Sequence, residues 1–173
     1  MRSHKLDWGI GMEPDILIRR ATLEDVLAIH RLIQSYPHEL ILRPVNNIVE
    51  NIDRFTVAAR ENEIIACACW QILPEIGCPE GATVELQSVA VSQAYRGRGI
   101  GSRLIRFVLQ RIDGFKPVQA IVLTFEPEFF GRLGFREIEK KKIIHKIYRG
   151  CIYCTKHTNP FTCPEIAMAL QLR

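Results

Sequence analysis

The sequence VELQSVAV at residues 84–91, followed by SQAYRGRGIGS at residues 92–102, decides the fold of this chain. Its first eight residues are rich in β-branched and apolar types and alternate in polarity, which predicts a half-buried strand. Apolar residues at helical spacing predict a helix over residues 98–112, and a glycine-rich loop joins the two elements. Free backbone N–H groups and the positive end of the helix dipole meet at such a loop, so it favours phosphate oxygens.

The glycine spacing narrows the choice of phosphate ligand. The glycines at 97, 99 and 101 form G-x-G-x-G, which is neither the G-x-G-x-x-G of dinucleotide sites nor a P-loop. The remaining pattern, Arg96-x-x-Gly99-x-Gly101 after a strand that ends in VAV, resembles the acetyl-CoA loop of the GCN5-related N-acetyltransferases (GNAT). In that family the loop amides hold the CoA pyrophosphate and the preceding strand pairs with the pantetheine arm. The alternative is a glycine-rich turn that carries surface arginines.

The other elements are expected in an order that suits this family. Periodicity and turn residues predict strands at 16–20, 55–59, 64–73, 118–125 and 135–139, and helices at 22–36, 45–52 and 128–133. The strand–helix–strand run from 84 to 125 predicts a right-handed crossover with parallel strands. The resemblance implies the GNAT fold, an α/β class with a mixed sheet that is flanked by helices and splayed near the CoA loop. We expect residues 1–14 to be a loose leader and residues 15–173 to form a single domain with a cysteine-containing tail.

A second family-like signature is FFGRLGF at residues 129–135. Many GNAT enzymes carry, five residues before its last phenylalanine, a tyrosine that protonates the departing CoA thiolate; here that position is Phe130. The stretch IVLTFEPEFF (121–130), the Leu42-Arg43 segment and the tail resemble the short, single-domain bacterial N-acetylglutamate synthases, in which a Phe-Phe pair likewise replaces the tyrosine. This implies direct acetyl transfer from acetyl-CoA to the α-amine of L-glutamate within a ternary complex, a step of arginine biosynthesis.

The resemblance also assigns residues to roles. It places acetyl-CoA against Val89, Ala90, Val91, Arg96, Gly97, Arg98, Gly99, Ile100, Gly101, Ser102, Phe129 and Phe130. Glu85 is a candidate base, directly or through a water molecule, if its side chain faces the splay rather than solvent. Ser88 and Thr124 are the nearest hydroxyls for contact with a water or the thiolate, although each is also an ordinary strand residue.

The acceptor side departs from the family. An arginine often stands two residues after the glutamate that aligns with Glu85, and here that residue is Gln87, which can hydrogen-bond a carboxylate but cannot neutralise it. We therefore expect Arg43 and Lys146 to supply the cations, with Phe125 beside them. Another amine as acceptor stays open, as does a non-catalytic acyl-CoA-binding or metal-binding regulatory module.

The tail contains Cys151-x-x-Cys154-x-x-His157 and then Cys163. Tetrahedral zinc would accept these four ligands, and such a zinc would be structural. The spacing matches no standard zinc knuckle, so packed or redox-active thiols are favoured and no metal is assigned. Cys67, Cys69 and Cys78 are expected to be reduced thiols in or near a strand.

Composition limits the classes of partner. The 173 residues carry a net charge of +4, with 47% hydrophobic and 24% charged residues, which is ordinary for a globular protein. No stretch interleaves basic and aromatic residues as nucleic-acid grooves do, and no apolar run reaches the roughly 20 residues of a membrane helix. The N-terminus lacks the apolar core of a signal peptide, so we expect a cytoplasmic protein with a small-molecule amine as its partner. A homodimer stays open.

Overall fold

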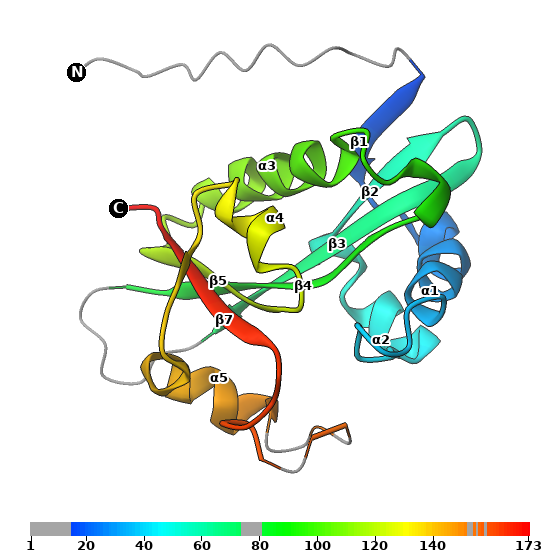
Figure 1. Cartoon of the computed structure of the whole chain (residues 1–173). Coiled ribbons are helices and arrows are strands. Elements are labelled where there is room, and N and C mark those ends of the chain that lie inside the picture. Colours follow the sequence, from blue (N-terminus) through cyan, green and yellow to red (C-terminus); the bar gives the residue numbers. More distant parts are fainter. Residues whose placement is uncertain (1–14, 74–80, 152–153, 155, 158) are drawn as a thin grey trace, which may run out of the picture.

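The computed structural model describes residues 15–73, 81–151, 154, 156–157 and 159–173, so the expected leader over residues 1–14 and Cys78 lie outside the described residues. The described residues build one mixed sheet of seven strands in the order β1-β2-β3-β4-β5-β7-β6 (Figure 1). The strands are β1 (Ile16–Arg20), β2 (Phe55–Arg60), β3 (Glu63–Leu73), β4 (Thr83–Val91), β5 (Gln119–Thr124), β6 (Arg136–Glu137) and β7 (Ile166–Gln171).

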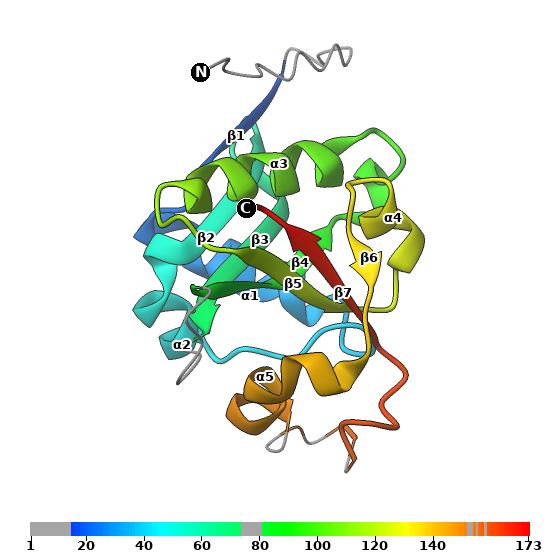
Figure 2. The same cartoon turned by 90° about the vertical axis from the view of Figure 1, so that its left-hand side faces the viewer.

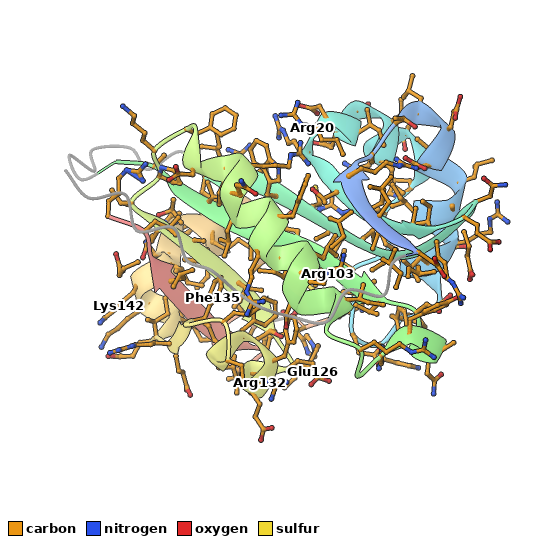
Figure 3. All side chains as sticks on the ribbon, turned by 90° about the horizontal axis from the view of Figure 1, so that it is seen from above. Arg20, Arg103, Glu126, Arg132, Phe135 and Lys142 are labelled. Carbon is orange, nitrogen blue, oxygen red and sulfur yellow. The ribbon has the colours of Figure 1, made fainter. Side chains whose placement is uncertain are left out.

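The sheet contains the predicted crossover. β4 and β5 pair in parallel, whereas the other neighbouring strands pair in antiparallel fashion. The connection between β4 and β5 runs through helix α3 (Ile100–Asp113), which lies across the sheet (Figure 3). The fold class predicted from the sequence, a mixed sheet flanked by helices, is confirmed.

Helices cover both faces of the sheet (Figures 1 and 2). α3 and the short α4 (Pro127–Gly131) lie on one face, while α1 (Val26–Gln34), α2 (Val45–Glu50) and α5 (Ile144–Arg149) lie on the other. Single 3₁₀ turns lie at Leu23–Asp25, Ile52–Arg54, Gln93–Tyr95 and Lys140–Ile143. Among the described helices, none is long and apolar enough to cross a membrane.

Strand alternation divides the core into two faces. On β4, Val84 and Leu86 pack with Leu104 and Ile105 of α3 in one hydrophobic cluster. The intervening Glu85 therefore points to the opposite face, because successive side chains of a strand alternate. Each fully buried Leu or Ile contributes about 1.5–3 kcal/mol, so α3 is held firmly against β4 and fixes the loop that precedes it.

The C-terminal third differs from the sequence-based expectation. The sequence predicted neither β7 nor α5, and it predicted a strand at 135–139 where β6 has two residues. The sequence IAMALQ of β7 is rich in helix-forming residues, but six register pairs with β5 stabilise it as a strand. Tertiary pairing has overridden local propensity, and it places the tail of the chain beside the splayed strands.

Candidate active site

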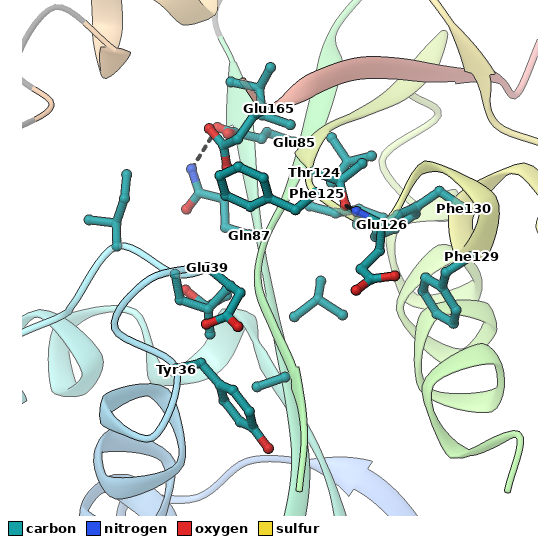
Figure 4. A pocket seen from close by; sticks show the side chains of 18 of the residues that line it. Tyr36, Glu39, Glu85, Gln87, Thr124, Phe125, Glu126, Phe129, Phe130 and Glu165 are labelled. Atoms are coloured by element: carbon teal, nitrogen blue, oxygen red, sulfur yellow. Dashed lines mark hydrogen bonds between the residues drawn. The ribbon is translucent and has the colours of Figure 1, made fainter. Parts of the chain in front are cut away.

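The centre of the site is a gap in the sheet between β4 and β5. The described parallel ladder has three register pairs, of which Glu85 with Ile121 is the last. Beyond them a cavity of about 660 Å³ is lined by Glu85–Val91 of β4 and by residues 122–126 from β5 and the turn after it (Figure 4). Because no described strand pairs with β4 on this side beyond Glu85, the backbone N–H and C=O groups of β4 here are available to an extended ligand.

A β-bulge re-aims β4 at this point. Cys67 is opposite Ala90 and Cys69 is opposite Gln87, so β4 carries one residue more than β3 between these pairs. Ser88 in the bulge has φ +51°, a left-handed conformation that is uncommon for a non-glycine residue. Bulges of this kind bend a strand and redirect its side chains, and they often lie next to active sites.

Arg43 holds this bulge from the α2 side. Its Nε donates to Ser88 Oγ at 2.7 Å and its Nη1 donates to Asn47 Oδ1 at 2.7 Å. Its Nη2 donates to Gln87 Oε1. The guanidinium thus holds the bulge through the side chains of Gln87 and Ser88, and Arg43 is not among the residues that line the cavity.

The glycine-rich loop fits a phosphate group. Gly97 and Gly99 have φ +79° and +75°, and a Cβ added to either would meet nothing within 4 Å. Their conformation therefore requires glycine, and their outer side is open to a ligand. Gly99 is the N-cap of the 14-residue α3, so free N–H groups and the helix dipole meet there. Gly101 is packed instead: a Cβ would lie 3.2 Å from the Phe129 ring.

The two arginines of the loop have different surroundings. Arg96 lines the cavity, its guanidinium carbon lies 4.7 Å from the centre of the Tyr36 ring, and its Nε donates to the Val91 carbonyl at 3.2 Å. Tyr36 Oη donates to the same carbonyl at 2.8 Å. Arg98 does not line the cavity, and its guanidinium carbon lies 5.5 Å from the Tyr95 ring centre.

A buried ion pair lies at the other end of the cavity. Glu85 Oε1 is 2.7 Å from Lys146 Nζ of α5, and the two side chains are only 5% and 12% exposed. Glu85 Oε2 accepts a hydrogen bond from Gln87 Nε2 at 2.6 Å. Glu85 therefore faces the splay rather than solvent, and both of its oxygens are engaged.

A second carboxyl, from Glu165, lines the same end of the cavity (Figure 4). Glu165 directly precedes β7, and burial raises its pKa, an effect that Cys163, Lys146 and Lys140 partly oppose and the charge of Glu85 reinforces. Sequence analysis missed Glu165 because β7 itself gave no strand signal. It also missed Tyr36, Glu39 and Glu126, which line the cavity from loops and helix ends.

Aromatic rings form the wall beneath the loop. Phe130 is 3% exposed and packs edge-on against Phe129 and Phe135, at centroid distances of 4.9 and 5.4 Å. Glu126 and Arg132 flank this wall at α4 and also line the cavity (Figure 3). Thr124 Oγ1 accepts the N–H of Glu126 at 2.9 Å, which holds the turn between β5 and α4.

The tail contributes Cys154, His157, Pro160 and Cys163 to the lining of the cavity. Lys156 Nζ donates to the carbonyls of Pro37 at 2.7 Å and of Leu40, in the loop after α1. Lys140 Nζ donates to the carbonyl of Pro160 at 3.2 Å and to that of Cys163. Lys156 thus joins the tail to the loop after α1 and Lys140 joins it to the 3₁₀ turn before α5, with backbone carbonyls as their partners.

The four candidate metal ligands, Cys151, Cys154, His157 and Cys163, all line the cavity. The described residues nevertheless contain no group of three or more His, Cys, Asp or Glu side chains placed to hold a metal ion. Burial raises the pKa of the Cys151 and Cys163 thiols, so both favour the protonated form. Cys67 and Cys69 are buried in the sheet, as predicted, and burial raises their pKa values to about 12 and about 11.

The cavity brings together most of the side chains that the sequence singled out. Beyond Arg96 and the Gly-rich loop, the predicted residues on its wall are Glu85, Gln87, Ser88, Val89, Ala90, Val91, Ile100, Ser102, Thr124, Phe125, Phe129, Phe130 and Lys146. Phe125 is 39% exposed there, as expected of a contact surface for a ligand. The roles assigned to these residues stay predictions.

Comparison with known proteins agrees with this geometry. The family of acetyltransferase (GNAT) domains matches residues 51–137. An uncharacterized N-acetyltransferase of Chlorobaculum tepidum is 34% identical over 160 residues, which cover 91% of this chain and 97% of that protein. An amino-acid acetyltransferase of Mycobacterium tuberculosis is 31% identical over 137 residues, 76% of this chain and 75% of that protein.

Solved structures share the fold. A Mycobacterium tuberculosis protein in complex with CoA and NLQ has a TM-score of 0.74 and 27% identity, over 91% of this chain and 99% of that chain. The N-acetylglutamate synthase of Neisseria gonorrhoeae, complexed with CoA and N-acetyl-glutamate, has a TM-score of 0.75 over 95% of this chain and 37% of its own. At 20% identity, the second likeness shows the fold alone.

Proposed function

We propose that this chain, which belongs to the GNAT family and is an N-acetyltransferase with acetyl-CoA as its co-substrate, transfers the acetyl group to the α-amine of L-glutamate. The loop from Arg96 to Gly101 would hold the CoA pyrophosphate, and β4 beyond the bulge would pair with the pantetheine arm. Direct attack by the amine within a ternary complex suits a single cavity that runs from this loop to the acceptor end.

The observation that carries the proposal is the buried pair of Glu85 and Lys146. An α-amino acid bears an ammonium and a carboxylate on one carbon, so it presents to this pair the opposite charge at each position. Its α-carboxylate would be bound by Lys146 and its ammonium would lie beside Glu85. An amine without a carboxylate would forgo the charge-assisted hydrogen bond from Lys146 and keep only the attraction to Glu85. The pair therefore favours α-amino acids among amines.

The side-chain carboxylate of glutamate needs a further partner. Gln87 offers an amide at the position where relatives of this kind often carry arginine, and Lys140 lines the cavity beside Glu165. Carboxylates outnumber lysines among these lining residues, with Glu39, Glu85 and Glu165 against Lys140 and Lys146. This charge balance favours, as a second candidate, a neutral α-amino acid over glutamate.

Steady-state release of CoA thiol tests both candidates. The purified chain is assayed with acetyl-CoA and with L-glutamate, L-aspartate, L-glutamine and L-arginine in parallel. The proposal expects the highest kcat/KM with L-glutamate and no turnover with an amine that lacks the α-carboxylate. A higher kcat/KM with L-glutamine would support the neutral acceptor. Turnover of simple amines as fast as that of amino acids would refute the role of the ion pair.

A further inference from the structure

Two carboxylates meet at the acceptor end of the cavity, and they differ in what holds them. Glu85 is fixed on both oxygens, by Lys146 at 2.7 Å and by Gln87 at 2.6 Å. For Glu165, the hydrogen bond found in the described part of the chain is a long one, from Cys163 Sγ at 3.7 Å. A thiol is a weak donor, so the Glu165 carboxylate keeps its lone pairs available.

We propose that Glu165 is the proton acceptor for the amine, and that Glu85 is a fixed negative charge that orients the ammonium beside it. The Glu85 oxygens are engaged by an ammonium and an amide, whereas the donor to Glu165 is a weak thiol, so Glu165 is the carboxylate with oxygens free to take a proton from a substrate. Glu165 lines the cavity immediately before β7, at the same end as Glu85 and Gln87 (Figure 4). This inference rests on acetyl transfer in this cavity and deepens the mechanism proposed for it.

The surroundings of Glu165 suit this role. It is faced by Lys146 from α5, Lys140 from the 3₁₀ turn before α5, Glu85 from β4 and Cys163 from the tail. Burial dominates among these influences and raises the pKa of Glu165 above that of an ordinary glutamate. A base works best when its pKa approaches the working pH, so the raised pKa makes Glu165 a stronger base than a solvated carboxylate.

The chemistry balances with Glu165 in this position. The substrate ammonium must lose two protons, and the Glu165 carboxylate takes the first, which frees the nitrogen lone pair. The nitrogen then bonds to the thioester carbonyl carbon, the C–S bond breaks, and its electron pair leaves on the CoA sulfur. The second nitrogen proton passes through water to that thiolate and gives the CoA thiol. Glu165 releases the first proton to solvent and is again a carboxylate.

The absence of a tyrosine at position 130 fits this scheme. Phe130 is 3% exposed and has no proton to give, so in this scheme the thiolate receives its proton through water. The open cavity supplies that route, because it extends from the aromatic wall to the tail. A proton carrier is then needed on the amine side alone, and Glu165 provides it.

The test is the pH dependence of Glu165→Gln. The assay uses the best amine of the panel and saturating acetyl-CoA. As the pH increases, kcat/KM of the unchanged protein should rise while a carboxyl loses its proton, and then level off. In E165Q the rate at pH 7 should fall about 100-fold or more, while the KM for acetyl-CoA changes less than twofold. The remaining activity of E165Q should rise about tenfold per pH unit toward the pKa of the amine, because only amine that is already neutral can react.

Three further variants keep the test decisive. Glu165→Asp should retain the levelling of the profile at a lower rate, which also covers the case in which E165Q folds poorly. Glu137→Gln, an exposed glutamate on β6, should behave as the unchanged protein. Glu85→Gln should raise the KM for the amine but keep the shape of the profile. A uniform loss in E165Q at every pH, or a lost carboxyl limb in E85Q alone, would overturn the proposal.

Because the test uses whichever amine the protein acetylates best, its outcome is separate from the glutamate assignment. If L-glutamate is not the best acceptor, the E165Q profile still decides the role of Glu165. If L-glutamate is the best acceptor and E165Q keeps the unchanged profile, the substrate stands and the base is wrong.

Discussion

Replacing Lys146 by methionine should destabilise the protein far more than the same replacement at Lys141. Both lysines form an ion pair of similar length, Lys146 with Glu85 at 2.7 Å and Lys141 with Glu139 at 2.5 Å. They differ in burial: the first pair is 12% and 5% exposed, the second 71% and 63%. Lys141→Met is therefore a control matched in chemistry and distance.

The magnitude follows from burial. Removing one partner of a buried pair leaves an uncompensated charge and costs about 3–5 kcal/mol, whereas an exposed pair contributes about 0–1 kcal/mol. At roughly 2–4 °C per kcal/mol for a domain of this size, K146M should lower Tm by about 6–20 °C. K141M should change Tm by at most about 4 °C by the same conversion. The loss in K146M is a large part of a total stability of about 5–15 kcal/mol.

Urea denaturation and a double-mutant cycle check the reasoning. Neutralising both partners in Glu85→Gln/Lys146→Met removes the unpaired charge, so the double variant should be more stable than K146M alone by about 2 kcal/mol or more. If K146M and K141M lose the same free energy of unfolding, or if the effects of E85Q and K146M simply add, then burial does not govern this pair.

Three more outcomes follow from single contacts. Gly99→Ala should lower the free energy of unfolding by about 1–2 kcal/mol and raise the KM for acetyl-CoA, because an alanine at φ +75° is strained at the N-cap of α3. Gly131→Ala, with no positive φ and open space around its Cβ, should change neither quantity appreciably. Asp25→Asn should lose about 1–3 kcal/mol at pH 7, because a bidentate guanidinium lowers the pKa of that carboxyl. Stability that comes from a lowered pKa is present above the unfolded pKa of 3.8 and is lost as the pH falls through the folded pKa. The difference in free energy of unfolding between D25N and the unchanged protein should therefore shrink when denaturation is measured at low pH. Lys156→Met should raise the KM for the amine several-fold and leave that for acetyl-CoA unchanged, because this lysine ties the tail to the loop after α1. Lys142→Met, which changes an exposed lysine in the same way, should alter neither KM.

The sequence predicted well wherever the determining interactions are local. The run from β4 to α3 carries its own alternation, its own positive-φ glycines and its own helical spacing, so its strand, loop and helix could be identified from residues 84–112 alone. Lys146 was singled out as a cation of the site, and it lies in the cavity. The ion pair that it forms could not be predicted, because it depends on α5 folding back onto β4.

Prediction failed where distant pairing decides the outcome. Glu165 follows a Cys-Pro step and precedes a segment with helical composition, so no local pattern marks it as part of a site. Its position is set by β7, which pairs with β5 through six residues; Ile166, directly after Glu165, is opposite Thr124 at the splay. Arg43 was expected to clamp the substrate, and the structure places its donors on Ser88, Asn47 and Gln87 instead. Whether it also influences the acceptor stays a prediction.

That contact of Arg43 explains why a glutamine is suited to position 87. Arg43 donates to Gln87 Oε1, and Gln87 Nε2 donates in turn to Glu85 Oε2. Successive hydrogen bonds polarise one another, so the guanidinium strengthens the amide donor that holds Glu85. An arginine at 87 would bring a second guanidinium against the first, and like charges at such a distance repel strongly in a partly buried place. Arg43 therefore stays outside the cavity lining, and the Gln87 amide transmits its influence to Glu85 without adding another guanidinium to the lysines that line the cavity.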